Sequence, residues 1–286
     1  MATVCVADNA LQLDAIVKEY CKDSSILPKI IHQIWMNFSN NKEYNVPPAK
    51  YAKSGDSWKQ NHKGFLYICW SKDLVEDFVA TFFNKYRDIY NNLKYNIQRI
   101  DIVRYMFLYR YGGVYADMDI FCISNIYDKL VENGNIFFTT SPTNQGVLAN
   151  SIMICKKEQK LFMYMLDHIS KGLWYENVSK HITVMNSTGP LALSKIVHSY
   201  DGNVVIIPSS IYNSDDTSDK KEVDEKRVLI NGCFRSWFGP ESVTLSAAHS
   251  NKMFVITIVF IGFVVLCFYC ILFFRSVRNK NNRKRR

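Results

Sequence analysis

The chain has 286 residues, 48% of them hydrophobic, which is enough for a core domain of roughly 200 residues or more. The net charge is +9, but residues 275–286 hold seven basic residues and no acid, so the rest of the chain carries only +2. A body this close to neutral has no basic surface for nucleic acid, and we expect no nucleic-acid partner.

The predicted elements alternate between strands and helices along the chain. Residues 1–27 form a weakly helical N-terminal extension without the apolar core of a signal peptide. Hydrophobic periodicity then predicts strands at 29–35, 65–70, 136–140, 151–155 and 204–208, and helices at 74–86, 97–111, 160–171 and 190–200. Alternation of this kind is typical of an α/β layer architecture.

The most informative segment follows the helix at 97–111. Gly112 and Gly113 end that helix, and the next residues predict a strand that carries Asp117 and Asp119. Side chains alternate faces along a strand, so both carboxylates would point the same way, with Cα atoms roughly 6.5–7 Å apart. Two adjacent carboxylates repel each other, and Mg²⁺ or Mn²⁺ would relieve that repulsion and could hold a diphosphate.

Further polar and aromatic residues are candidates for the same site. Asp101 and Arg104 share a helix face, either as a surface ion pair or pointing into the cleft of the D-x-D pair. Trp35 ends a strand and is either a core residue or a platform for a nucleobase. Asn150 precedes a strand and is either a polar site residue or a turn former.

The C-terminal end predicts a membrane anchor. Residues 253–274 form an uncharged apolar run of 22 residues, long enough to cross a bilayer as one helix. The basic tail at 275–286 follows at once, and the positive-inside rule places it in the cytoplasm. A body inserted from the cytosol is the competing layout, and the side of the membrane that holds the body stays open.

Several segments together resemble glycosyltransferase family 32. They are Pro28–Trp35, the string Asp101-x-x-Arg104-Tyr105, the string Tyr109-x-Tyr111-Gly112-Gly113-Val114-Tyr115-x-Asp117-x-Asp119, Asn150 and Thr188–Pro190. The resemblance implies a GT-A-like, Rossmann-related domain over residues 28–246. It also implies a hexosyltransferase that retains the anomeric configuration and uses Mn²⁺ or Mg²⁺ with a GDP- or UDP-hexose donor. Mannose is the favoured sugar, and the acceptor would be a lipid or glycan at a membrane of the Golgi or ER.

The resemblance also implies roles for single residues. Asp119 would bind the metal, and Asp117 would contact the ribose or the metal. Asp101 and Arg104 would hold the donor sugar, and Asn150 would lie near the acceptor. The nucleotide would be lined by Gln33, Ile34 and Trp35.

One position departs from the family pattern. Many relatives carry a histidine a few residues before a Ser-Trp pair, and here Asn231 stands about where that histidine would fall. Asn231 is therefore the candidate third metal ligand, through a weaker oxygen. Two other functions remain open: a binding protein that kept the fold without catalysis, and a D-x-D phosphohydrolase, which the Gly-Gly turn disfavours.

Overall fold

The computed structural model describes residues 1–21, 26–39, 41–130, 134–141, 144–172, 179–214, 228–232, 240, 242 and 269. The chain divides into two compact units, residues 1–235 and 236–286. Every helix and strand described below belongs to the first unit.

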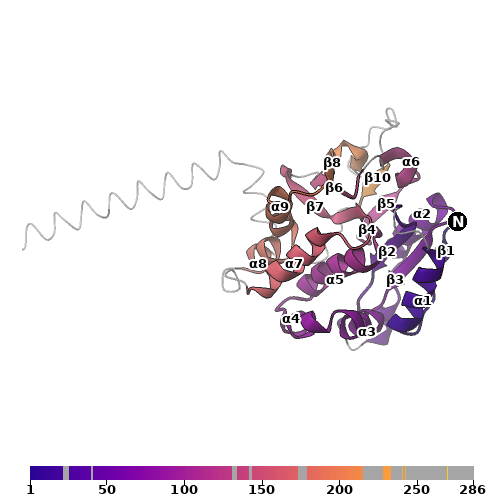
Figure 1. The fold of residues 1–286 in the computed structure, drawn as a ribbon, viewed down its shortest axis with the longest axis horizontal. Coiled ribbons are helices and arrows are strands. Elements are labelled where there is room, and N and C mark those ends of the chain that lie inside the picture. The colour runs from indigo at the N-terminus through magenta and orange to yellow at the C-terminus, as the bar shows by residue number, and fades with distance from the viewer. Residues whose placement is uncertain are drawn as a thin grey trace, which may run out of the picture. The chain divides into compact units, whose positions relative to one another are not determined.

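Within the described residues, seven strands form a mixed sheet at the centre of this unit (Figure 1). The strand order is β1-β3-β2-β4-β7-β6-β8. Strands β1, β3, β2 and β4 are parallel, β7 is antiparallel to β4 and β6, and β8 is parallel to β6. The bounds are β1 Thr3–Val4, β2 Ile30–Ile34, β3 Leu66–Trp70, β4 Gly113–Ala116, β6 Ile136–Ser141, β7 Asn144–Cys155 and β8 Val204–Ile207. The expected α/β architecture is confirmed.

Helices with apolar faces pack on one side of this sheet. Alternate residues of β2 show the two sides, because Ile30 belongs to this core and Ile31 to the core of the other face. The helices of the unit on this side are α1 Ala10–Tyr20, α3 Lys72–Phe82, α4 Arg87–Asn92, α5 Asn96–Tyr111, α7 Lys160–Ser170 and α9 Pro190–His198, and α8 Lys180–Ser187 contacts α5 and α9. Residues 10–20, expected as an extension, thus join the main core.

The other side of the sheet is covered by α2 and a small second sheet. Helix α2 (Ala49–Asn61) packs on β5 (Ile120–Cys122), and Trp58 and Ile126 enter the core of this side. Strand β5 pairs antiparallel with β10 (Leu229–Asn231), which pairs parallel with β9 (Tyr212–Ser214). The remaining elements are the short helix α6 Ile126–Leu130 and the 3₁₀ turns η1 Lys42–Asn45, η2 Asn84–Tyr86 and η3 Ser209–Ile211.

The predicted membrane anchor is not tested by this structure. Across the part of the chain that the structure describes, no helix has the length and apolar character needed to cross a bilayer. Apart from residue 269, the segment 253–274 lies outside the described residues, as do the basic tail at 275–286 and the Ser236-Trp237 pair. The anchor therefore stays a prediction.

Candidate functional site

The D-x-D pair lies in a turn and not, as the sequence indicates, along a strand. Strand β4 ends at Ala116, and the N–H of Asp117 donates to the carbonyl of Ser151 at 2.8 Å. The chain then turns, since the N–H of Ile120 donates to the carbonyl of Asp117 at 3.0 Å. The expectation that strand alternation aligns the two carboxylates is therefore wrong, because Asp119 belongs to the turn between β4 and β5.

Buried side chains hold the backbone of this turn from behind. Gln33 Nε2 donates to the carbonyl of Asp117 at 3.1 Å. The carbonyl of Ile120 accepts from Ser54 Oγ and from Trp58 Nε1, each at 2.7 Å. Gln33, expected beside the nucleotide, is instead fully buried behind the turn and positions it.

Helix α2 supports the rest of β5 in the same way. The N–H of Cys122 donates to Ser57 Oγ at 3.0 Å, and Asn61 Nδ2 donates to the carbonyl of Cys122 at 2.9 Å. Polar side chains of α2 thus hydrogen-bond to backbone groups along one edge of β5, while β10 pairs with the other edge. Sequence analysis missed these supporting residues because α2 is polar and lies in a segment without a clear apolar stripe.

Asn231 is brought next to the D-x-D turn by strand pairing. In the antiparallel pair of β10 and β5, Asn231 lies opposite Ile120. The following N–H, of Gly232, donates to the carbonyl of Asp119 at 2.8 Å. The residue at the position of the family's histidine therefore neighbours Asp119 through the backbone.

Arg104 lies between two carboxylates. Its NH2 is 3.0 Å from Asp101 Oδ1, and its NH1 is 3.3 Å from Asp117 Oδ1. The Arg104 and Asp101 side chains are 2% and 4% exposed, whereas the Asp117 side chain is 30% exposed and faces solvent in part. The Tyr115 hydroxyl also donates to Asp117 Oδ1. The surface-pair interpretation of Asp101 and Arg104 is thus wrong, since both are buried beneath the turn.

Asp101 has protein partners on both oxygens. Oδ1 accepts from Asn150 Nδ2 at 3.0 Å, and Oδ2 accepts from the Thr188 hydroxyl at 2.7 Å. The carbonyl of Asn150 also accepts from Arg104 NH1 at 2.7 Å, and the Tyr105 hydroxyl donates to the carbonyl of Thr188 at 2.7 Å. Burial raises the pKa of Asp101 to about 6, against the lowering effect of Arg104. At neutral pH this carboxylate is therefore ionised.

The residues expected to line the nucleotide differ in their exposure to solvent. Ile34 is buried in the core, whereas Trp35 directly after β2 is half-buried and packs against Tyr51, with ring centroids 4.9 Å apart. The indole N–H of Trp35 donates to the carbonyl of Tyr44 at 2.8 Å. Because β2 and β4 are parallel neighbours, Trp35 and Asp117 leave the sheet at the same edge. An aromatic pair thus lies at the edge that carries the D-x-D turn.

The charges of this site suit a hard divalent cation. The Arg104 guanidinium pairs with two carboxylates, of Asp101 and Asp117, and Asp119 adds a third carboxyl group in the same turn. Among the described residues, no group of three or more His, Cys, Asp or Glu side chains could hold a metal by itself. Mg²⁺ typically binds one or two carboxylates plus substrate phosphates, and Asp119 and Asn231, which are neighbours through the backbone, carry oxygen donors of the kind that this pattern uses.

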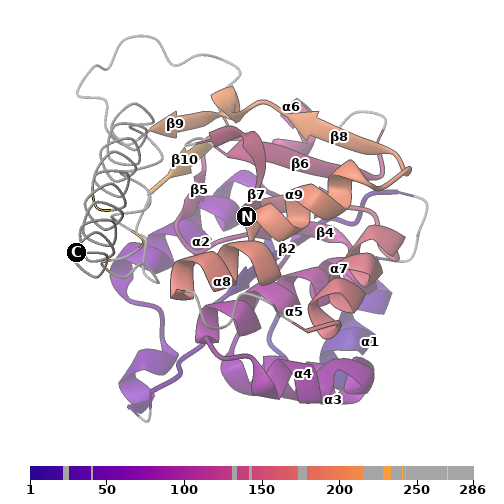
Figure 2. The same cartoon turned by 90° about the vertical axis from the view of Figure 1, so that its left-hand side faces the viewer.

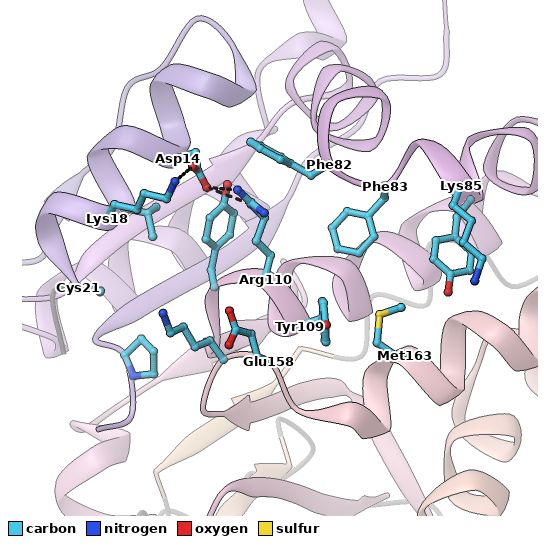
Figure 3. A pocket seen from close by; sticks show the side chains of 15 residues that line it. Asp14, Lys18, Cys21, Phe82, Phe83, Lys85, Tyr109, Arg110, Glu158 and Met163 are labelled. Carbon is cyan, nitrogen blue, oxygen red and sulfur yellow. Dashed lines mark hydrogen bonds and ion pairs between the residues drawn. The ribbon is translucent and has the colours of Figure 1, made fainter. Parts of the chain in front are cut away.

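A cavity of about 510 Å³ lies elsewhere, between α1, α3, α5 and α7 (Figure 3). In its wall Asp14 pairs with Lys18 at 2.8 Å and with Arg110 at 2.7 Å, and the Arg110 guanidinium lies 3.5 Å from the centre of the Phe82 ring. Arg110 follows Asp101 by nine residues on α5, about 13 Å along the helix axis. The cavity is therefore separate from the D-x-D turn.

Comparison with known proteins agrees with the geometry. Residues 48–137 match the family described as "Glycosyltransferase sugar-binding region containing DXD motif". That range includes Asp101, Arg104 and the D-x-D turn.

Several relatives are named inositol phosphoceramide mannosyltransferases. Inositol phosphoceramide mannosyltransferase 3 of Schizosaccharomyces pombe is 32% identical over 62% of this chain and 46% of its own length. Inositol phosphoceramide mannosyltransferase 1 of the same organism is 25% identical over 91% of this chain and 76% of its own length. The chain spans about half the length of several curated relatives that it matches.

Among solved structures, the PaToxG glycosyltransferase aligns with a TM-score of 0.46 and 18% identity, over 65% of this chain and 75% of that one. The chain thus contains a glycosyltransferase sugar-binding region with a DXD motif, at residues 48–137, and is similar to the named mannosyltransferases.

Proposed function

We propose that this chain transfers a hexose, with mannose favoured, from a GDP- or UDP-sugar to a membrane-borne glycolipid or glycan, in a metal-dependent reaction that retains the anomeric configuration. The observation that carries the proposal is Arg104, buried between Asp101 and Asp117 directly beneath the D-x-D turn. The relatives named as inositol phosphoceramide mannosyltransferases favour a phosphosphingolipid acceptor. The domain would be of the GT-A type over residues 28–246.

The residues of the turn have distinct tasks in this proposal. Asp119 would hold the cation, with Asn231 beside it as a second oxygen donor. A bound Mn²⁺ or Mg²⁺ would supply the Lewis-acid stabilisation that the departing diphosphate needs. Asp117 has one oxygen occupied by Arg104 and Tyr115, so its other oxygen is the one that could reach the ribose or the cation.

The buried residues would shape the floor of the donor-sugar site. Arg104 fixes Asp117 and at the same time offsets part of the negative charge, so the site does not reject the anionic donor. Asp101 and Asn150 would act by holding Arg104 in place, because their polar side-chain atoms already bond to each other and to Arg104 or Thr188. Trp35 and Tyr51 would stack on the nucleobase.

The membrane part of the proposal rests on the sequence and on the relatives. A span at 253–274 would keep the chain at an endomembrane, the Golgi or the ER, where a lipid acceptor is within reach.

The test uses the full chain in detergent, with Mn²⁺ and a panel of UDP- and GDP-sugars, and follows release of nucleoside diphosphate. We expect one donor to be turned over, and Asp119→Asn to reduce turnover by at least about a hundredfold. Asp201→Asn, which changes an exposed aspartate between α9 and β8, is the matched control and should leave turnover unchanged.

Two other results would redirect the assignment. Donor binding without turnover, even with inositol phosphoceramide present, would favour the non-catalytic binding protein, with Asn231 as the leading cause. Turnover that survives Asp119→Asn would remove the turn from the mechanism.

A further inference from the structure

In the loop between β2 and α2, residues 41–48 present apolar side chains to solvent. Tyr44 is 54% exposed and Val46 is 71% exposed. The segment that contains η1 projects from the rest of the described unit at the lower left of Figure 2, beside α2. Single exposed apolar residues are common on protein surfaces. Two of them on one projecting loop near a candidate active site indicate a surface that binds something.

Hydrogen bonds give this loop a defined shape. Asn37 Nδ2 donates to the carbonyl of Asn41 at 2.6 Å and to Asn45 Oδ1 at 2.8 Å. Trp35 Nε1 anchors the tip by donating to the backbone carbonyl of Tyr44. These contacts leave the Tyr44 and Val46 side chains exposed, so their exposure belongs to a fixed conformation.

The charge of the segment points to an anionic surface. Residues 41–53 contain three lysines, Lys42, Lys50 and Lys53, all exposed, and one acid, Glu43, a net charge of +2. A second exposed apolar group, on Met1, Val4, Val6 and Leu11, lies in residues 1–17, which contain two aspartates and no basic side chain. Basic side chains around aromatic and aliphatic ones are the pattern by which a protein contacts a bilayer with anionic lipids.

The position of the loop in the fold connects this exposed surface with the candidate site. The loop leaves the C-terminal end of β2, and the D-x-D turn leaves the C-terminal end of the parallel neighbour β4. Both therefore lie at one edge of the sheet. A bilayer that touches the loop would bring lipid headgroups to the side of the molecule that carries the turn.

We propose that residues 41–53 dock on a bilayer containing anionic lipid, with Tyr44 and Val46 entering the headgroup region. The contact itself is independent of catalysis. Its role, which is to present a lipid headgroup to the D-x-D turn, rests on the proposed function.

A direct test places a photo-crosslinking amino acid at position 44 or 46 of the full chain, reconstituted in vesicles of phosphatidylcholine with phosphatidylserine. Position 164 is the matched control, because Tyr164 is 51% exposed and lies on α7. Helix α7 starts just after Cys155, which pairs with Gly113 at the beginning of β4, so this control lies towards the opposite edge.

Lipid adducts from positions 44 and 46 that clearly exceed those from 164 support the proposal. Equal adducts from all three positions, or none from 44 and 46, overturn it. In vesicles of phosphatidylcholine alone, adduct yield from position 44 should fall, and each Lys→Gln exchange in 41–53 should weaken the contact about fivefold.

A second arm tests the role of the contact. Tyr44→Ser with Val46→Ser should lower transfer to an acceptor embedded in vesicles, whereas hydrolysis of the nucleotide sugar should not change, because the bond from Trp35 uses the backbone of Tyr44. Tyr164→Ser should change neither rate. Equal loss of transfer and hydrolysis, or no loss of transfer, overturns the role. If no donor is hydrolysed at all, the proposed function fails, while the crosslinking result still decides the contact.

Discussion

His32 should make the fold sensitive to acid. It is fully buried on β2 against the rings of Phe107 and Tyr111. Its Nδ1 accepts from the indole N–H of Trp70 at 3.2 Å, and its Nε2 lies 2.9 Å from the carbonyl of Gly112. An indole nitrogen only donates and a carbonyl only accepts, so the ring carries its proton on Nε2 and is neutral. A second proton would place an N–H against the N–H of Trp70.

The pKa shift gives the size of the effect. Burial lowers the pKa of His32 from 6.5 to about 4, although the Gly112 carbonyl opposes this shift. The unfolded chain therefore binds this proton first as the pH falls, and the folded state loses stability between pH 6.5 and pH 4. Each pKa unit corresponds to 1.36 kcal/mol, so His32 alone should contribute a loss of about 3 kcal/mol over this range.

The assay is denaturant unfolding of the full chain in detergent at several pH values, followed by tryptophan fluorescence. His32→Gln keeps one donor and one acceptor but does not titrate, so its free energy of unfolding should fall about 3 kcal/mol less than that of the wild type over this range. Exposed His198→Gln is the matched control and should follow the wild type. If His32→Gln and the wild type show the same pH dependence, the argument from the neutral ring is refuted.

Three further substitutions test the turn and its support. Gly113→Ala should lower the free energy of unfolding, measured by denaturation, by at least about 2 kcal/mol, because φ is +88° and a Cβ would lie 2.6 Å from a carbonyl of β2. Gly64→Ala is the control: φ is +77° but nothing lies within 4 Å, so the free energy of unfolding should fall by less. Thr188→Val leaves an oxygen of Asp101 without its hydrogen-bond donor and should lower the free energy of unfolding, measured thermally, by about 1–3 kcal/mol. Thr188→Ser keeps the hydroxyl donor and should retain most of the wild-type stability. Arg104→Lys should lower kcat/KM by at least about a hundredfold with an unchanged circular dichroism spectrum, because one ammonium lacks the planar fork that spans two carboxylates.

Hydrophobic periodicity was sufficient to find the elements with strong apolar patterns. The expected helix at 97–111 is α5 (Asn96–Tyr111), and the expected strands at 29–35 and 65–70 are β2 and β3. Helix α2 was missed because it packs on β5 through hydroxyl, amide and indole groups, and such a face has no apolar stripe.

The arrangement of the site could be predicted where helix geometry determines which side chains are neighbours. It could not be predicted where tertiary hydrogen bonds determine the backbone conformation. The i, i+3 spacing placed Asp101 and Arg104 on one face, and the structure confirms that they lie together beneath the D-x-D pair. The position of Asp119 depends on the bond from Ile120 to Asp117 that closes the turn, and local sequence does not reveal that bond. Roles in catalysis and metal binding stay predictions.

The way the D-x-D turn is held in place also matters for protein engineering. Its conformation depends on bonds to backbone carbonyls from Gln33, Ser54 and Trp58, and none of these bonds uses the carboxylate of Asp119. The groups that hold the turn and the carboxylate proposed to bind the metal thus belong to different residues. At the proposed metal site, a library varied only at positions 119 and 231 would test softer cations, such as Co²⁺ or Zn²⁺, while keeping the residues that form these three bonds.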